Sequence, residues 1–198
     1  MVIKMNGEEL SYTLENEKTL GEVLGGIEEA CCREHETIVQ VAVDGKVLNS
    51  QELDLLFKQP VDTDITIELS TLSGTEIRNY MKDLTQELSL YIEYFEQVPV
   101  YMQTGKDVQV LNLLGTFSEK LNELYRSLLL SDVTELPVDK LQIEEKSIHE
   151  YQKEITALLH DIVSSIEEKD IIQVGDLAEY ELAPLVKTLI NGVSSTLN

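Results

Sequence analysis

The sequence predicts an α+β protein in which a small sheet-containing domain precedes an antiparallel four-helix bundle. The main observation is a change of period. Up to about residue 72 the apolar residues alternate as they do in strands, and from residue 73 they recur every three or four residues as they do on one face of a helix. The length of 198 residues allows two domains. We therefore expect one domain over residues 1–72 and a second over residues 73–198.

The first domain is expected to open with a β-hairpin and a helix. Residues 2–5 form a short, largely apolar run, Asn6-Gly7 is a dipeptide that tight hairpin turns favour, and alternating apolar residues continue to residue 14. Thr19 and Glu22 have the spacing of a capping box, so a helix is expected from there to about residue 33. Three glycines in this helix indicate either close packing on the sheet or a loosened first turn. They are Gly21, Gly25 and Gly26.

A second hairpin and a last strand complete this domain. Valines alternate with other residues over 39–43, and Asp44-Gly45 then gives a turn into a short strand. Residues 50–57 can form a short helix, and apolar residues alternate again over 65–69. The order strand, strand, helix, strand, strand, short helix, strand is that of the β-grasp fold.

Residues 38–71, which read IVQVAVDGKVLNSQELDLLFKQPVDTDITIELST, resemble the second half of a ubiquitin-like domain. In that family a strand meets a Gly-Lys turn, here Gly45 and Lys46, and a leucine follows, here Leu48. Ubiquitin and the related sulfur carriers act through a free C-terminal Gly-Gly, whereas here the last strand continues into a long helix. The resemblance therefore implies the scaffold and binding of proteins through one sheet face, without the conjugation chemistry.

Capping and spacing patterns predict the first two helices of the second domain. Ser73 and Glu76 form a capping box, and eight apolar residues follow at alternating steps of four and three, so a helix is expected up to about Met102 with a kink near Pro99. Asp107 is expected to cap the next helix, which runs to about residue 130. The eight residues are Ile77, Met81, Leu84, Leu88, Tyr91, Phe95, Val98 and Met102.

Two further helices complete the predicted bundle. A seven-residue apolar repeat predicts a helix over about residues 139–168, and another is expected from Asp170, with a kink at Pro184. Four long amphipathic helices with short connections are typical of an antiparallel bundle. Residues 170–189, DIIQVGDLAEYELAPLVKTL, resemble a stretch of uncharacterised bacterial helical proteins, which implies no function. The repeat consists of Leu141, Ile148, Ile155 and Ile162.

The composition argues against several classes of partner. With 37 acidic and 15 basic residues the formal net charge is −22, which repels nucleic acid and anionic membranes. No extended apolar run suggests a signal peptide or a membrane span. The two cysteines, Cys31 and Cys32, are adjacent and do not form the spaced framework of a secreted domain. We therefore expect a cytoplasmic protein that binds neither nucleic acid nor membrane.

One cluster has metal-binding residue types. Cys31, Cys32 and His35 lie close together at the end of the first helix, and thiolates and imidazoles bind zinc. A fourth ligand is not evident and the spacing matches no established zinc module, so we assign no metal site. A buried small residue next to an exposed one explains the two cysteines as well.

Six residues of the second half are candidate partner contacts. Tyrosine is enriched at protein interfaces, although on a bundle helix it also forms the edge of the core with its hydroxyl in water. Three acidic residues surround a tyrosine shortly before Pro184, either as a solvated face or as carboxylates that meet a ligand or partner. The candidates are Tyr94, Tyr101, Asp176, Glu179, Tyr180 and Glu181.

No catalytic pattern stands out, because the sequence has no glycine-rich nucleotide loop, no nucleophile elbow and no Glu-x-x-His pair of the kind found in di-iron bundles. We therefore expect a non-enzymatic protein-interaction or scaffolding protein, with no catalytic residue and no cofactor, whose protein partner the sequence does not identify. An assembly factor or chaperone for a protein client is a narrower form of this hypothesis. The alternative is a metal or small-ligand binding protein that uses Cys31, Cys32 and His35 or the acidic patch near Tyr180.

Overall fold

The computed structural model of the chain describes residues 1–62, 64–136 and 141–197. These residues divide into two units, which we call the sheet unit and the helical unit. The sheet unit contains the described residues up to Ile77 and also residues 132–135. The helical unit contains residues 78–131 and the described residues from 136 onwards. The chain is therefore a mixed α+β protein with its sheet in the N-terminal region.

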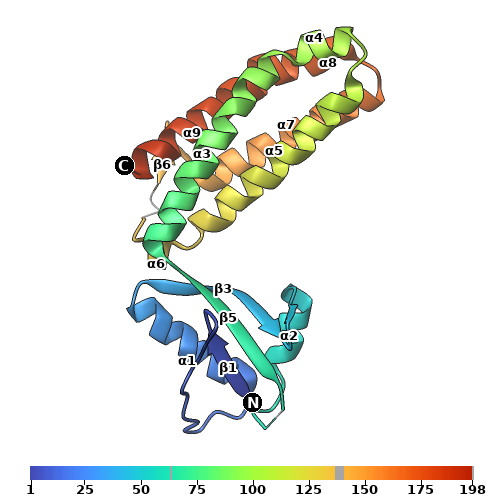
Figure 1. The fold of residues 1–198 in the computed structure, drawn as a ribbon. Helices are drawn as coiled ribbons and strands as arrows, with labels where there is room; N and C mark the ends of the chain where they lie inside the picture. Colours follow the sequence, from blue (N-terminus) through green and yellow to red (C-terminus); the bar gives the residue numbers. More distant parts are fainter. Residues whose placement is uncertain (63, 137–140, 198) are drawn as a thin grey trace. The chain divides into compact units, whose positions relative to one another are not determined.

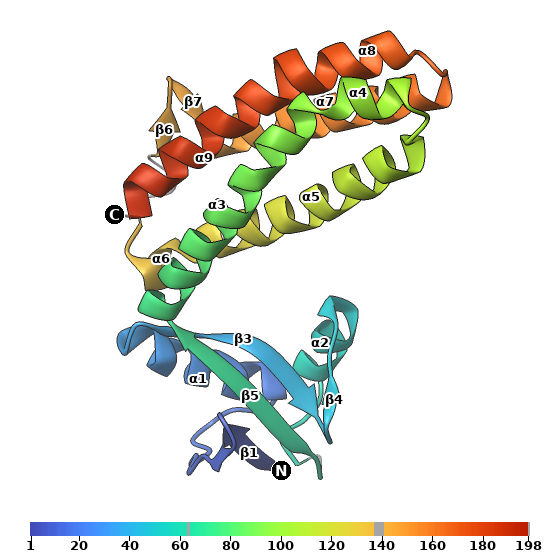
Figure 2. The same ribbon diagram turned by 45° about the horizontal axis from the view of Figure 1, so that its top comes forward.

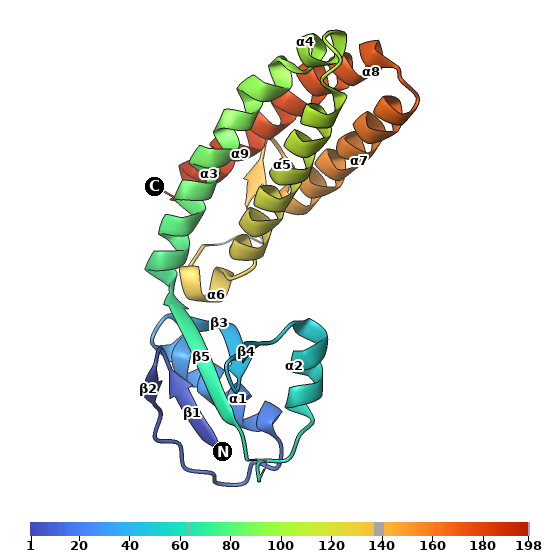
Figure 3. The same ribbon diagram turned by 45° about the vertical axis from the view of Figure 1, so that its right-hand side comes forward.

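A five-stranded mixed sheet forms the framework of the sheet unit, with strand order β2-β1-β5-β3-β4 (Figure 1; Figure 3). β1 runs parallel to β5, and the other neighbouring pairs are antiparallel. Helix α1 (Leu20–Arg33) covers one face, and the shorter α2 (Ser50–Phe57) follows β4. The strands are β1 (Val2–Met5), β2 (Glu8–Glu9), β3 (Glu36–Val43), β4 (Lys46–Val47) and β5 (Thr66–Ser73).

Both hairpins of this sheet turn at the predicted dipeptides. Asn6 and Gly7 have φ values of 51° and 88°, and Asp44 and Gly45 have values of 48° and 81°. Two consecutive residues with positive φ are the requirement of a type I′ turn, which Asn-Gly and Asp-Gly meet at low cost.

The return strand of the first hairpin is shorter than predicted. Pairing ends with Leu10, whose N–H donates to the Ile3 carbonyl at 2.8 Å, and residues 11–14 are not a strand. The predicted strand through Leu14 is therefore wrong. Since β1 has only four residues, it offers no further backbone partners. The chain turns toward α1 instead, where a Cβ on Gly26 would lie 3.3 Å from the Tyr12 hydroxyl.

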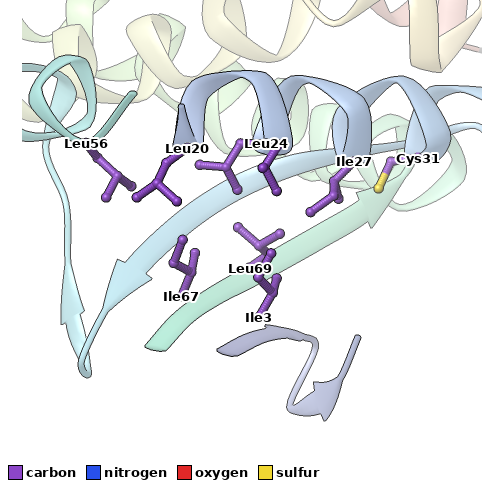
Figure 4. Close-up of a cluster of buried hydrophobic side chains, with 9 residues drawn as sticks. Ile3, Leu20, Leu24, Ile27, Cys31, Leu56, Ile67 and Leu69 are labelled. Atoms are coloured by element: carbon purple, nitrogen blue, oxygen red, sulfur yellow. The ribbon is translucent and has the colours of Figure 1, made fainter. Parts of the chain in front are cut away.

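The core of the sheet unit forms between α1 and the sheet (Figure 4). One face of α1 points its apolar side chains at the central strands, as the helical spacing predicts. The predicted capping box is confirmed, because Thr19 Oγ1 accepts from Glu22 N at 3.3 Å and the Glu22 carboxylate accepts from Thr19 N at 3.2 Å. The buried residues are Ile3, Leu20, Val23, Leu24, Ile27, Cys31, Leu56, Ile67 and Leu69.

Gly21 decides between the two explanations for the glycines of α1. A Cβ on Gly21 would lie 2.8 Å from the Phe57 carbonyl oxygen, so the residue is needed for close packing. The close neighbour is the end of α2 and not the sheet. A Cβ on Gly25 would meet nothing within 4 Å, so that glycine has no packing role among the described residues.

The C-terminal part of the described chain is helical, with one two-stranded sheet (Figure 2). The first turn of α3 and residues 132–134 of α6 belong to the sheet unit. The strands are β6 (Gln142–Ile143) and β7 (Lys146–Ser147). The helices are α3 (Gly74–Glu96), α4 (Val98–Gln103), α5 (Asp107–Leu128), α6 (Ser131–Thr134), α7 (Ile148–Glu167), α8 (Ile171–Asp176), the π-helix η2 (Leu177–Leu182) and α9 (Ala183–Leu197).

The predicted long helix after residue 73 begins as expected and is interrupted near Pro99. The Glu76 carboxylate accepts from Ser73 N at 2.8 Å and Glu76 N donates to Ser73 Oγ at 3.2 Å, which confirms the capping box. α3 ends at Glu96, and Pro99 lies in the first turn of α4, where a missing N–H costs nothing. Seven of the eight predicted apolar residues are buried; Tyr91 is half-buried.

Asp107 does not cap α5, contrary to prediction. It is the first helical residue, and Lys106 occupies the cap position without a side-chain capping bond. The Lys106 N–H instead closes the end of α4 by donating to the Tyr101 carbonyl at 2.9 Å, after Gly105 with a φ of 71°. This bond gives the Tyr101 carbonyl at the end of α4 a hydrogen-bond donor, and Asp107 becomes a residue of α5 and not its cap.

The third helix starts later than predicted, because residues 142–147 form a hairpin and not a helix. α7 begins at Ile148, where Ser147 and Glu150 exchange both bonds of a capping box. Tyr151 Oη donates to the Ile143 carbonyl at 3.2 Å and so holds the hairpin against α7. The predicted start near residue 139 lies outside the described residues.

The chain accommodates Pro184 by widening into a π-helix. Over η2 the helix takes an extra residue per turn, and Ala183 N donates to the Ala178 carbonyl five residues earlier. Proline has no N–H for an ordinary helical bond, and the structure has this π-helix next to Pro184, where the prediction was a kink. The predicted helix start at Asp170 is confirmed: Asp170 is the N-cap of α8, and its Oδ1 accepts from Gln173 N at 3.0 Å.

Among the residues that the structure describes, none of the helices combines the length and the apolar character needed to cross a bilayer.

Candidate functional site

Of the two candidate tyrosines on α3 and α4, Tyr94 extends an aromatic cluster to the surface and Tyr101 contacts a lysine. Tyr94 is exposed and packs edge-on against Tyr91, with ring centroids 6.1 Å apart at 78°. Tyr91 in turn lies 5.4 Å from the Phe117 ring. Tyr101 is half-buried, and Lys106 Nζ lies 5.2 Å from its ring centroid. Both tyrosines therefore have anchored rings at the protein surface.

The acidic candidates surround Tyr180 at the end of α8 and in η2. Tyr180 is 67% exposed, and its hydrogen bond to Glu179, together with the charges of Glu179 and Asp176, raises its pKa. Glu181 is exposed and not partly buried. The carboxylates therefore form a solvated acidic face with one projecting aromatic ring.

Exposed apolar side chains that the sequence patterns did not indicate lie on α4, at the start of α5 and at the start of α8; α4 contacts both of the other helices. α4 packs along α8 so closely that a Cβ on Gly175 would lie 3.2 Å from Pro99 Cγ (Figure 1; Figure 2). Four β-branched side chains on these elements are exposed by 43–73%. We call them the apolar end: Val100, Val108, Ile171 and Ile172. None of the four belongs to the regularly spaced apolar residues that are buried in the core, and each lies near the end of a helix. An apolar residue in such a position is the signal by which the sequence could have indicated this surface.

The proposed metal ligands do not converge. Cys31 is buried in the core of the sheet unit, and burial raises the pKa of its thiol. Cys32 is exposed and lies 3.6 Å from a Glu28 carboxylate oxygen, and His35 Nδ1 lies 3.4 Å from Glu135 Oε1. Within the described ranges, no group of three or more histidine, cysteine, aspartate or glutamate residues is arranged to hold a metal ion.

The helical unit contains a cavity of about 470 Å³ between the last turns of α5 and the first turn of α7. Tyr125 and Arg126 line it from α5, and Ile148 and His149 line it from α7. The position of this cavity depends on the start of α7 at Ile148. The seven-residue repeat predicted an earlier start and so gave no indication of the cavity.

Comparisons with known proteins match both parts of the chain. Residues 1–73 match a family model described as the TP0873 N-terminal domain, and residues 79–192 match one described as a domain of unknown function, DUF8042. An uncharacterized protein of Treponema pallidum (strain Nichols) is 42% identical over 193 residues, which cover 98% of this chain and 96% of that protein. No solved structure matches the chain significantly.

Proposed function

This chain belongs to the DUF8042 family, and we propose that it is a non-enzymatic protein-interaction or scaffolding protein that binds a protein partner at its apolar end. The observation that carries the proposal is the exposure of four β-branched side chains on adjoining elements of a chain with a net charge of −22. Apolar groups gathered on an otherwise charged surface are typical of contact sites.

The surroundings of the apolar end indicate the chemistry of the partner. Tyr101 lies on α4 next to it, and Asp176, Glu179 and Tyr180 continue from α8 into η2. The complementary surface is an apolar patch bordered by basic side chains, since opposite charges at the rim guide association. An assembly factor or chaperone that holds a basic client is the narrower form of this proposal.

Two finer features of the fold belong to the same proposal. The strand order β2-β1-β5-β3-β4, with β1 parallel to β5 and α1 across one face, supports a β-grasp module over residues 1–72. The lengths and mutual packing of α3, α5, α7 and the α8–α9 segment support an antiparallel four-helix bundle over residues 73–198 (Figure 2). We also propose a cytoplasmic location, supported by the adjacent positions of Cys31 and Cys32, which differ from the spaced cysteine framework of secreted domains.

Site-specific photo-crosslinking in the source cell tests the proposed interaction. A benzophenone amino acid is placed at Ile172 in one full-length chain and at Glu119, an exposed position in the middle of α5, in another. We expect a discrete protein adduct from position 172 only, and its loss when Val108→Asp is added. The same adducts from both positions, or an adduct that survives Val108→Asp, would contradict the proposal.

A further inference from the structure

The cavity between α5 and α7 has the size and wall composition of a small-molecule site. Its volume of about 470 Å³ falls in the range of pockets that enclose small ligands. Leu128, Leu129 and Ile148 provide an apolar wall. The cavity lies at the opposite end of α5 from Val108, so it is separate from the apolar end.

Tyr125 lines this cavity, and its buried hydroxyl is an unused hydrogen-bond donor. Its side chain is only 7% exposed, and its hydroxyl is buried with no hydrogen-bond partner among the described residues. Burial raises the pKa of Tyr125, so the hydroxyl keeps its proton at neutral pH. A buried hydroxyl without a partner lowers stability, and a ligand that offers an acceptor oxygen removes that penalty.

The charge at the cavity is opposite to the charge of the chain. None of the described residues that line it is acidic, although the protein has 37 acidic residues. Arg126 and His149 line it, and Arg126 forms no salt bridge with a described residue. The nearby carboxylate of Glu123 already accepts hydrogen bonds from Tyr80 Oη at 2.6 Å and from Lys120 Nζ at 3.3 Å.

The first turn of α7 adds positive potential on the same side. Ser147, Ile148 and His149, which form the N-cap and the first two positions of this 20-residue helix, all line the cavity. The N–H groups of a first turn have no acceptor within their own helix, and the helix dipole places partial positive charge there. The Glu150 carboxylate offsets part of this charge, but it is engaged by Ser147 N and Ser147 Oγ, both at 2.7 Å.

We propose that this cavity binds a small organic anion, a carboxylate or phosphate ester with a short apolar body. The anionic group meets Arg126 and the first turn of α7, and the apolar body packs on Leu128, Leu129 and Ile148. Tyr125 Oη, which is buried in the free protein, turns on binding to donate to an acceptor oxygen of the ligand.

Binding of four matched probes to the full-length chain tests the class of ligand. Phenylacetate and phenyl phosphate carry the anion, and 2-phenylethanol and phenethylamine carry the same ring without it. By calorimetry and by amide shifts of Arg126 and His149, we expect saturable binding of at least one anion, about tenfold or more tighter than the alcohol and the amine. Preference between the two anions distinguishes a carboxylate from a phosphate ester. Equal binding of all four probes, or of none, would overturn the proposal.

Three variants test the roles of the named side chains. Arg126→Gln is expected to weaken the anions about fivefold or more. The control Lys187→Gln, an exposed cation on α9, a helix that contributes no lining residue among those described, should leave affinity unchanged. Tyr125→Phe should weaken binding while the free protein melts at the same or a higher temperature, because an unpartnered hydroxyl has gone. Unchanged affinity in both Arg126→Gln and Tyr125→Phe would refute the site, whatever the fate of the proposed protein interaction.

Discussion

At the scale of single residues, Glu28 ties α1 to strand β3. One of its carboxylate oxygens accepts from Thr37 Oγ1 at 2.5 Å, and the other accepts from the backbone N–H of Ile38 at 2.8 Å. Glu28 is half-buried and Thr37 is buried, so the loss of the carboxylate leaves donors with restricted access to water.

We predict that Glu28→Ala lowers the free energy of unfolding of the sheet unit by about 1–3 kcal/mol, the usual cost of leaving buried donors without a partner. The measurement is hydrogen exchange of the Ile67 amide in the central strand β5. Glu29→Ala is the matched control, because Glu29 is exposed and, among the residues that the structure describes, its carboxylate pairs only with Arg33, at 3.8 Å. It should change the same free energy by less than about 0.5 kcal/mol.

Glu17 organises the loop before α1. Its carboxylate accepts from Tyr12 Oη at 2.8 Å, from Glu15 N at 2.7 Å and from Asn16 N at 3.1 Å. Backbone N–H groups, its own included, and the Tyr12 hydroxyl hold the pKa of Glu17 at about 2, below the usual 4.5. A lowered pKa in the folded protein means that the loop contacts are complete above pH 4.5 and are lost as the pH falls from 4.5 toward 2.

We therefore expect the amides of Glu15 and Asn16 to lose protection from hydrogen exchange over that pH interval, after correction for the intrinsic pH dependence of exchange. Glu17→Gln should show low protection at every pH. Protection that persists unchanged to pH 2 in the unsubstituted protein would refute this role of the carboxylate.

At the scale of elements, capping boxes proved the most dependable sequence signal. Those at Thr19 and Ser73 mark the observed starts of α1 and α3, because a side chain that satisfies free N–H groups acts locally. Ser147 and Glu150 also have the spacing of a capping box. The prediction followed the seven-residue repeat through Leu141 instead and therefore started the helix too early. The β6–β7 turn was also hidden, since Glu144 and Glu145 adopt positive φ without glycine or asparagine to signal it.

The candidate cavity could not be predicted for the same reason. It depends on where the hairpin ends and α7 begins, and on tertiary contacts that leave the Tyr125 hydroxyl without a partner among the described residues. Tyr125 is buried with the apolar face of α5, and periodicity carries no information about the hydrogen bonds of such a residue.

Packing of the β6–β7 hairpin on α9 depends on Gly192. A Cβ there would lie 2.5 Å from Ile143 Cγ1, too close without movement of the hairpin.

We predict that Gly192→Ala destabilises the helical unit by about 1–3 kcal/mol, as overpacking does. Gly115→Ala is the matched control, because a Cβ on Gly115 would meet nothing within 4 Å. It should stabilise α5 by about 0.5–1 kcal/mol. Urea unfolding followed by the helical circular dichroism signal measures both, and similar effects of the two substitutions would contradict the packing role.

At the scale of the whole molecule, the charge of −22 makes self-repulsion a general cost of folding. Acidic residues occur in both units, so a single ion pair cannot remove the electrostatic repulsion among them. Screening should therefore stabilise the folded chain, because the compact state holds like charges closer together than the unfolded state does.

We predict that raising NaCl from about 0.01 M to 0.1 M, which shortens the screening length from about 30 Å to 10 Å, raises the melting temperature by about 2–4 °C at neutral pH. The control is the same pair of salt concentrations near pH 4.3, the isoelectric point, where the increase should largely disappear. An equal increase at both pH values would show that salt acts by another route.

The strand order has a consequence for solubility. The sheet ends on both sides in strands of two residues, β2 and β4, while its longer strands, β3 and β5, lie inside. Because β4 pairs only with Ala42 and Val43, the outer edge of β3 over residues 36–40 has no strand partner among the described residues. The register shift between Ile38 and Gln40 makes this stretch irregular, and such an irregularity opposes edge-to-edge pairing with another copy when salt or acid weakens the repulsion between molecules.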